Sequence, residues 1–228
     1  MEHKDILDLM KRRHSVRQYT DEPISEELKE ALRVEISAIN GEGKLHFQPV
    51  FDEPQAFGGR MARYGSFTGV KNYIALVGEK GCDLDERVGY YGERLVLLAE
   101  ELGLNTCWVG LHYKKVADAF EVARGEKLVA VIAIGHGRHR GLPRRSKTPE
   151  QVSNITPASP EWFSRGVKGA LYAPTAMNQQ KFYFILQEDE TVSARASIGF
   201  YTHVDLGIAA YHFERASGVK PRFGKNLG

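Results

Sequence analysis

Two segments of the chain gather cations around a hydroxyl group. Arg12-Arg13-His14-Ser15-Val16-Arg17 lies at the end of an apolar-periodic stretch, and Arg144-Arg145-Ser146-Lys147 lies in a Pro- and Arg-rich segment, 139–148. Guanidinium groups bind phosphate oxygens in a bidentate manner, so either segment could clamp a phosphate. The alternatives are a solvated basic helix end that offsets the helix dipole for the first segment and a linker for the second. Taken alone, neither segment decides between these readings.

Two further segments carry groups that suit a planar ligand. Ala173-Pro174-Thr175-Ala176-Met177-Asn178-Gln179-Gln180 breaks a helix at Pro174 and then presents hydroxyl and amide groups, which can hydrogen-bond a heterocycle or a ribityl chain. Trp108-Val109-Gly110-Leu111 follows a core helix, and Gly110 would let a ligand approach a backbone N–H closely. The alternatives are a solvated turn and a core tryptophan, respectively.

Several kinds of chemistry find no support in the sequence. The eight histidines show no metal-ligand spacing, and Cys82 and Cys107 form no metal or redox motif. Walker, HExxH and GxSxG motifs are absent. Gly135-His136-Gly137 follows a strand, but the third glycine of a dinucleotide fingerprint is displaced and Pro143 prevents an immediate helix. We therefore expect neither a metal site nor a hydrolase.

The composition is that of an ordinary globular protein. The 228 residues include 31 Lys+Arg and 29 Asp+Glu, giving a net charge of +2, and 42% are hydrophobic. So small a charge argues against a strongly basic nucleic-acid binder. The N-terminus has no signal-peptide or anchor pattern, and no stretch approaches the roughly 18 to 20 apolar residues of a membrane span. With two unpaired cysteines, the sequence predicts a cytoplasmic protein that contacts neither nucleic acid nor membrane.

Apolar periodicity predicts both helices and strands. Helices are expected over 5–10, 25–40, 88–102, 116–122, 160–171 and 203–216. Strands are expected over 45–51, 72–77, 107–109, 128–134 and 182–186. A loop is expected over 54–69, Ser25 as a helix cap, and Gly218 as a helix stop.

The order of elements in the last third resembles that in the first part, which suggests an internal repeat. At an offset of 135, the matching residues are Glu26, Ala38, Phe47 and Glu53 with Glu161, Ala173, Phe182 and Glu188. At an offset of 115, they are Gly92 and Gly103 with Gly207 and Gly218. A second, shortened half copy would explain these pairs, and chance similarity is the rival explanation.

Four segments together resemble the nitroreductase family of FMN flavoproteins. They are Arg13-His14-Ser15-Val16-Arg17-Gln18-Tyr19 with Asp21-Glu22-Pro23-Ile24, then 101–110, 129–135 and 173–180. The resemblance implies an α+β, nitroreductase-like fold with a central, mostly antiparallel sheet flanked by helices. In that family the chains normally dimerise, and both contact the FMN at their interface.

The resemblance also implies which residues bind the cofactor. The phosphate and ribityl chain would be gripped by Arg13, His14, Ser15 and Arg17, with later basic contacts from Arg145 and Lys147. The backbone of Gly110 and Leu111 would lie beside flavin N5. The remaining side would be covered by Pro174, Thr175, Asn178 and Gln180.

The chain departs from the common family order. The 173–180 type of segment usually follows the second helix, where this chain has Ile39-Asn40-Gly41-Glu42-Gly43, and Lys181-Phe182 stands where Pro-Trp is usual. Together with the repeat, this predicts a pseudo-dimer. Residues 1–142 form a nitroreductase-like half with a phosphate-binding N-terminus, and residues 143–228 a truncated second half that completes one FMN site. The chain thus resembles the single-chain subgroup of putative nitroreductases, and we expect a monomeric pseudo-dimer or a weak homo-oligomer.

The activity implied by the resemblance is FMN-dependent reduction of nitroaromatic, quinone or related small acceptors by NAD(P)H. Hydride would pass through flavin N5 in ping-pong fashion. FMN would be tightly bound and would carry the chemistry, so no catalytic residue is assigned. The alternatives are a flavin-binding protein without reductase turnover and, disfavoured by the net charge, a nucleic-acid binder.

Overall fold

The computed structural model describes residues 5–224, which form two compact units. Unit 1 comprises residues 5–12, 85–94 and 143–224, and unit 2 comprises residues 13–84 and 95–142. Helix α4 (Leu84–Glu101) contributes to both units. None of the helices in the described range is long and apolar enough to cross a membrane.

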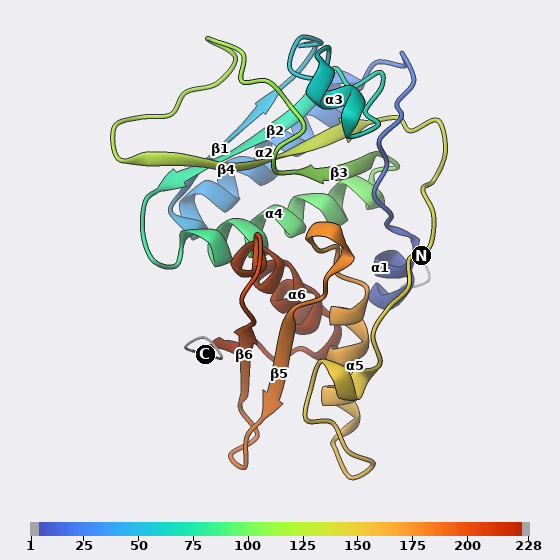
Figure 1. The fold of residues 1–228 in the computed structure, drawn as a ribbon, viewed down its shortest axis with the longest axis vertical. Helices are drawn as coiled ribbons and strands as arrows, with labels where there is room; N and C mark the ends of the chain where they lie inside the picture. The colour runs from blue at the N-terminus through green and yellow to red at the C-terminus, as the bar shows by residue number, and fades with distance from the viewer. Residues whose placement is uncertain (1–4, 225–228) are drawn as a thin grey trace. The chain divides into compact units, whose positions relative to one another are not determined.

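Unit 2 is built on an antiparallel sheet with the strand order β1-β2-β4-β3 (Figure 1). Its strands are β1 (Leu45–Val50), β2 (Asn72–Glu79), β3 (Asn105–Val109) and β4 (Glu126–Gly135). The central strands β2 and β4 are mostly apolar because both of their faces are covered. Cys107 of β3 lies opposite Ala133 of β4. This register sets where the chain leaves β3 at Gly110.

Helix α2 (Glu26–Gly43) and the second half of α4 cover one face of this sheet. Leu32 of α2, Ala99 of α4 and Ile134 of β4 belong to one buried cluster. Ser25 begins α2 as predicted, because its hydroxyl accepts a hydrogen bond from the backbone N–H three residues further on, at 3.4 Å.

The opposite face is covered by α3 (Arg60–Tyr64), by the loops around it and by the extended segment 13–19. Val16 and Tyr19 of this segment are buried in one cluster with Ala133 of β4. The alternation of side chains along β4 therefore places Ala133 and Ile134 in different clusters. The extended segment 13–19 is consequently anchored in the core of unit 2 by Val16 and Tyr19.

Hydrogen bonds of Val16 and Tyr19 fix the segment 13–19 beside the edge strand β3 and against β4. The Val16 N–H donates to the Thr106 carbonyl at 2.9 Å. The Tyr19 hydroxyl lies 2.8 Å from the Val16 carbonyl and 3.3 Å from the Ala133 carbonyl. The protein itself thus fixes the path of the residues predicted to bind phosphate.

Unit 1 combines helices with a small sheet of order β5-β6-β7. Its elements besides α4 are α1 (Ile6–Arg12), the short 3₁₀ helices η1 (Pro149–Gln151) and η2 (Ala176–Asn178), α5 (Glu161–Leu171), β5 (Phe182–Leu186), β6 (Val192–Ala196), α6 (Thr202–Ser217) and β7 (Arg222–Phe223). β5 and β6 are antiparallel, whereas β6 and β7 are parallel. In the core, Phe184 of β5 stacks on Phe213 of α6 with ring centroids 4.7 Å apart.

Most of the predicted elements are confirmed within a few residues at each end. They are the helices expected over 5–10, 25–40, 88–102, 160–171 and 203–216, and all the strands expected over 45–51, 72–77, 107–109, 128–134 and 182–186. The structure adds α3 inside the expected loop 54–69, and it adds the strands β6 and β7.

The helix expected over 116–122 is wrong. Asp118 has a φ of 62°, a left-handed conformation that a right-handed helix cannot contain. The side chain of Gln48 instead pairs with the backbone of Glu121, donating to its carbonyl at 2.7 Å and accepting from its N–H at 2.8 Å. Phe120 still packs against the core. The apolar spacing therefore reflects burial of an irregular loop.

The order helix, strand, strand, helix occurs twice along the chain. The series α2, β1, β2 and α4, which has the short helix α3 between its strands, is followed by α5, β5, β6 and α6, and in each series the two strands pair in antiparallel fashion. The predicted α+β class with a mostly antiparallel sheet is confirmed. The duplication itself stays a prediction.

Candidate functional site

Three groups of the N-terminal basic segment converge on one buried atom in unit 2. Burial raises the pKa of the Cys107 thiol, and the nearby Arg17, Ser15 and Arg13 side chains oppose that rise. Ser15 forms a bridge with Thr106, the residue before Cys107, so the segment runs beside this thiol. The structure therefore brings together three of the four residues predicted to grip phosphate.

The two guanidinium groups differ in their surroundings. Arg13 is only 4% exposed. Arg17 is exposed, and its guanidinium lies 5.9 Å from the ring centroid of Phe67, within cation–π range. The segment thus offers one buried cation and one that reaches the surface.

His14, the fourth member of the predicted grip, is half-buried against a glycine turn. Gly141 has a φ of 77°, and a Cβ built on it would lie 2.6 Å from the Cβ of His14 and 3.2 Å from the Ser15 carbonyl. Only glycine adopts this conformation at little cost and leaves room for that contact. The connector after β4 is therefore held directly against the basic segment.

Gly110 and Leu111 follow the end of β3, in the same unit. Gly110 is half-buried, and Leu111 is 55% exposed. The next residue, His112, lies against α3, with its ring centroid 5.7 Å from that of Tyr64. The predicted N5-facing backbone thus lies at the junction between β3 and α3.

The second basic segment and the 173–180 segment meet in unit 1. The Lys147 backbone N–H donates to Gln180 Oε1 at 2.8 Å, and Lys147 Nζ donates to the Gln180 carbonyl at 2.7 Å. Asn178 Nδ2 donates to the Arg145 carbonyl at 2.8 Å, and the Gln180 N–H donates to Thr175 Oγ1 at 3.1 Å. Residues far apart in the sequence are thus joined directly, as members of one site must be.

These bonds also show which side chains remain available to a ligand. Gln180 is 1% exposed and Pro174 is buried, whereas Arg145 and Asn178 are exposed. The side-chain oxygen of Gln180 and the ammonium group of Lys147 are both engaged in the hydrogen bonds between these two residues. They therefore shape the segment rather than present free donors to solvent.

The 173–180 segment contains three residues in left-handed backbone conformations. Met177, Asn178 and Gln180 have φ values of 50°, 54° and 45°. Such conformations cost energy for residues other than glycine and persist only where the surroundings enforce them, often at functional sites.

Asp205 of α6 is one of the groups that enforce this turn. Its Oδ1 accepts from the Ala176 N–H at 2.9 Å, and its Oδ2 accepts from Gln179 Nε2 at 2.8 Å. Asp205 is 2% exposed, and burial raises its pKa to about 6, although these two hydrogen bonds act in the opposite direction. The sequence analysis missed this residue. The available signal was a carboxylate inside the apolar run Val204-Asp205-Leu206.

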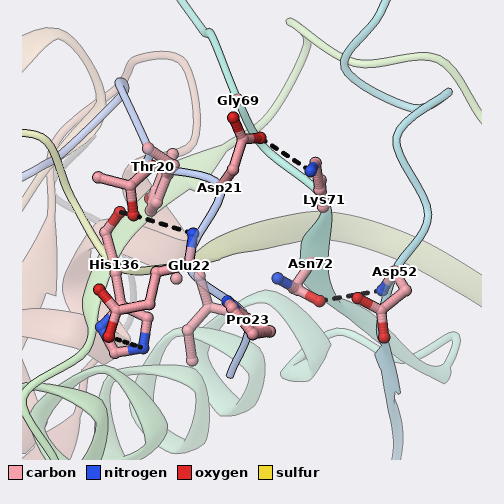
Figure 2. Close-up of a pocket in the computed structure, with 12 residues that line it drawn as sticks. Thr20, Asp21, Glu22, Pro23, Asp52, Gly69, Lys71, Asn72 and His136 are labelled. Carbon is pink, nitrogen blue, oxygen red and sulfur yellow. Dashed lines mark hydrogen bonds and ion pairs between the residues drawn. The ribbon is translucent and has the colours of Figure 1, made fainter. Parts of the chain in front are cut away.

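A separate pocket of about 240 Å³ lies in unit 2 (Figure 2). Within it, Lys71 Nζ lies 2.8 Å from Asp21 Oδ1, and Asn72 Oδ1 accepts from the Asp52 N–H at 3.0 Å. The pocket is smaller than the roughly 300 to 1,000 Å³ usual for sites of drug-sized ligands. None of the predicted site residues lines it. We therefore do not assign the cofactor to this pocket.

The part of the chain that the structure describes has no group of three or more His, Cys, Asp or Glu side chains placed to hold a metal ion. The predicted site residues form one set in unit 2 (13–17, 110 and 111) and one in unit 1 (145, 147 and 174–180). The polar side-chain groups of both sets are mainly guanidinium, ammonium, hydroxyl and amide groups. They suit an anionic organic ligand better than a cation.

The family model described as "Putative TM nitroreductase" matches residues 5–217 of the chain. The chain belongs to this family. The match spans both residue sets and confirms the resemblance inferred from the sequence. A search of curated proteins found no match.

Solved structures of nitroreductase relatives share the fold. A putative nitroreductase from Thermotoga maritima is 20% identical, with a TM-score of 0.67, and the match covers 95% of this chain and 85% of that one. A putative nitroreductase in complex with FMN from Desulfovibrio desulfuricans is 20% identical, with a TM-score of 0.53, and the match covers 69% and 99%. A nitroreductase family protein from Streptococcus pneumoniae is 14% identical, with a TM-score of 0.51, covering 65% and 98%. The last two structures thus match over nearly their whole length, and about a third of the present chain lies outside each match.

Proposed function

We propose that this nitroreductase family member binds FMN and transfers electrons from NAD(P)H to small acceptors such as nitroaromatics or quinones. The observation that carries the proposal is the position of Arg13, Ser15 and Arg17 on one short segment, which the bridge between Ser15 and Thr106 and the Val16 N–H bond to the Thr106 carbonyl hold against β3. The family match supports it, as does the related fold from Desulfovibrio desulfuricans, which is described in complex with FMN.

The donor set fits the phosphate of FMN. A phosphate dianion takes bidentate hydrogen bonds from guanidinium groups and further bonds from a hydroxyl. Arg13 and Arg17 supply the first kind and Ser15 the second. Because backbone hydrogen bonds to β3 and the contact with Gly141 hold this segment, little ordering is needed when the anion binds.

Bound FMN supplies hydride transfer at N5, and the protein supplies binding and orientation. In one full cycle with a quinone, NAD(P)H and one proton convert the quinone to a hydroquinone and leave NAD(P)⁺. We assign the backbone N–H groups near Gly110 and Leu111 to the side of the flavin that exchanges hydride. An amide N–H at that place would hydrogen-bond the flavin ring and stabilise negative charge on it.

We extend the proposal to the set in unit 1. Arg145, Thr175 and Asn178 are taken as groups that contact the cofactor, and Pro174 as part of the wall around it. Lys147 and Gln180 act by holding the segment through their mutual hydrogen bonds. We further propose tight FMN binding, one FMN per chain and a monomeric chain or weak homo-oligomer.

The first test is the colour of the purified protein. We expect a yellow protein that releases about one FMN per chain and bleaches when NADH or NADPH is added without oxygen. Oxidation by a quinone should restore the colour. Light scattering after size-exclusion chromatography gives the mass of the particle for the oligomeric state.

Three other outcomes carry distinct meanings. A colourless protein that takes up no added FMN would reject the cofactor. Bound FMN that neither nucleotide reduces would leave a flavin-binding protein without reductase turnover. Two FMN per chain would reject the single site.

A further inference from the structure

The surface made by α3 and the loop after β3, in unit 2, combines aromatic and basic side chains. Tyr64 of α3 is 83% exposed, so its ring is open to a ligand. Arg60 lies one helical turn before Tyr64, so the two share a face of α3. We call the surface formed by residues 60–64 and 111–115 the α3 face.

The α3 face carries four cations and no acidic residue, and Glu53 and Asp118 lie just outside the segments that contain it. Arg60, Arg63, Lys114 and Lys115 are exposed, and none of them forms an ion pair in the part of the chain that the structure describes. The segments 54–70 and 110–117 contain no Asp or Glu. By contrast, Lys71, just beyond the first segment, pairs with Asp21 at 2.8 Å. The α3 face is therefore a local positive patch on a chain of nearly neutral net charge.

The two parts of the face are held together. The rings of Tyr64 and His112 lie 5.7 Å apart, and a Cβ on Gly65 would lie 2.8 Å from the side chain of His112. The Lys114 N–H donates to the Ala56 carbonyl at 2.8 Å. The backbone beneath the exposed ring and the cations is therefore ordered before a ligand binds.

We propose that the α3 face binds the adenosine end of NADPH and makes the protein prefer NADPH over NADH. This inference rests on the proposed function for the identity of the nucleotide. Tyr64 stacks on the adenine, because every base offers a π-face to an exposed aromatic ring. Arg60 and Arg63 bind the 2′-phosphate, the group that distinguishes the two nucleotides.

The position of the face agrees with this assignment. Its second part, 111–115, begins directly after Gly110, where we place the hydride-exchanging side of the flavin. When the nicotinamide of NADPH binds there, the adenosine end of the same molecule needs a second binding surface nearby. Lys114 and Lys115 add positive charge for the pyrophosphate.

The decisive experiment uses two nucleotide fragments that need no FMN. Calorimetric titration of the full chain with adenosine 2′,5′-bisphosphate and with ADP, which lacks the 2′-phosphate, measures the preference directly. We expect at least tenfold tighter binding of the bisphosphate. The Arg60→Ala/Arg63→Ala variant should lose this preference, and Tyr64→Ala should weaken both ligands. The control Arg33→Ala/Arg124→Ala removes the same charge elsewhere in unit 2 and should keep the preference.

Turnover provides the second measurement. In the Arg60→Ala/Arg63→Ala variant, kcat/KM should fall at least tenfold with NADPH and little with NADH, with unchanged FMN content. Equal binding of the two fragments by the wild type, or a preference that survives in this variant, would overturn the inference. A wild type without FMN would reject the proposed function, while the fragment titration would still decide the 2′-phosphate site. Binding of a single-stranded oligonucleotide that requires the same residues, without the fragment preference, would assign the face to nucleic acid instead.

Discussion

Gly89 of α4 and Gly207 of α6 face each other's helix backbone in unit 1, and each is the sixth residue of its helix. A Cβ on Gly89 would lie 2.0 Å from the Val204 carbonyl oxygen, and one on Gly207 would lie 2.1 Å from the Glu86 carbonyl oxygen. Gly207 lies 118 positions after Gly89, and Val204 lies 118 positions after Glu86. Each glycine therefore contacts the residue that is equivalent to its partner's contact, as a two-fold axis between the helices would require. A duplicated helix would produce this crossing. Its register differs by three residues from the one that the glycine identities suggested.

Replacing Gly89 by Ala should destabilise unit 1 strongly. The added methyl group would overlap a backbone oxygen, which cannot move away without shifting a whole helix, and overpacking of this kind costs about 1 to 3 kcal/mol or more. Urea unfolding measures the change. Gly41→Ala is the matched control, because no atom lies within 4 Å of a Cβ there. It should stabilise α2 by about 0.5 to 1 kcal/mol. Equal effects of the two substitutions would contradict the close crossing.

Much of the fold follows from the periodicity of apolar residues. β2 and β4 are recognisable because strands covered on both faces read as continuous apolar runs. The short strands β6 and β7 carry no such signal, since β6 alternates and β7 has only two residues. The false helix over 116–122 arose because an irregular loop buries Phe120 with a spacing that also suits a helix.

The candidate site was predictable where the type of a residue indicates what it can bind. Arg13, Ser15 and Arg17 could be proposed from the sequence, and the structure places all three near Cys107. The role of Asp205 could not be inferred, because it depends on a turn 29 residues away along the chain. Likewise, the sequence does not reveal that Gln180 and Lys147 bond to each other.

Removing both guanidinium groups from the basic segment should abolish flavin retention. Each charged hydrogen bond contributes about 1.5 to 3 kcal/mol, so Arg13→Ala/Arg17→Ala should raise the Kd for FMN by at least about 100-fold. Flavin fluorescence titration and the FMN content of the purified variant measure the effect. Arg33→Ala, on the exposed side of α2, serves as the control and should bind FMN like the wild type. A double variant that still holds stoichiometric FMN would refute the phosphate assignment.

Met177→Gly should stabilise the protein. Met177 is 81% exposed with a φ of 50°, a conformation that costs about 1 to 2 kcal/mol for residues with a side chain. Glycine removes this cost, but it also makes the unfolded chain more flexible, which lowers the free energy of unfolding by about 0.4 to 1 kcal/mol. We expect a net gain of about 0.5 to 1 kcal/mol in urea unfolding. Val34→Gly, at an exposed position of α2, should instead destabilise. A loss of stability in both variants would show that the 173–180 turn is unstrained.

Asp205 should give the protein a pH dependence of the opposite sign to that of most carboxylates. Burial raises its pKa from 3.8 to about 6, so the folded state holds the proton more tightly than the unfolded state does. Its contribution to stability is therefore greatest below pH 4, declines as the pH rises through about 4 to 6, and is constant above. The total decline is about 3 kcal/mol, from 1.36 kcal/mol for each pKa unit.

The measurement compares urea unfolding of the wild type and Asp205→Asn from pH 4 to pH 7. The amide cannot titrate, and its oxygen can still accept from the Ala176 N–H. The wild type should therefore lose stability relative to the variant as the pH rises. Asp21→Asn is the control of opposite sign, because the hydrogen bond from Lys71 lowers the pKa of Asp21. There the wild type should lose stability relative to the variant as the pH falls below about 4, so this pair is followed down to about pH 3. Parallel curves for the wild type and Asp205→Asn would show that Asp205 holds the 173–180 turn without a raised pKa.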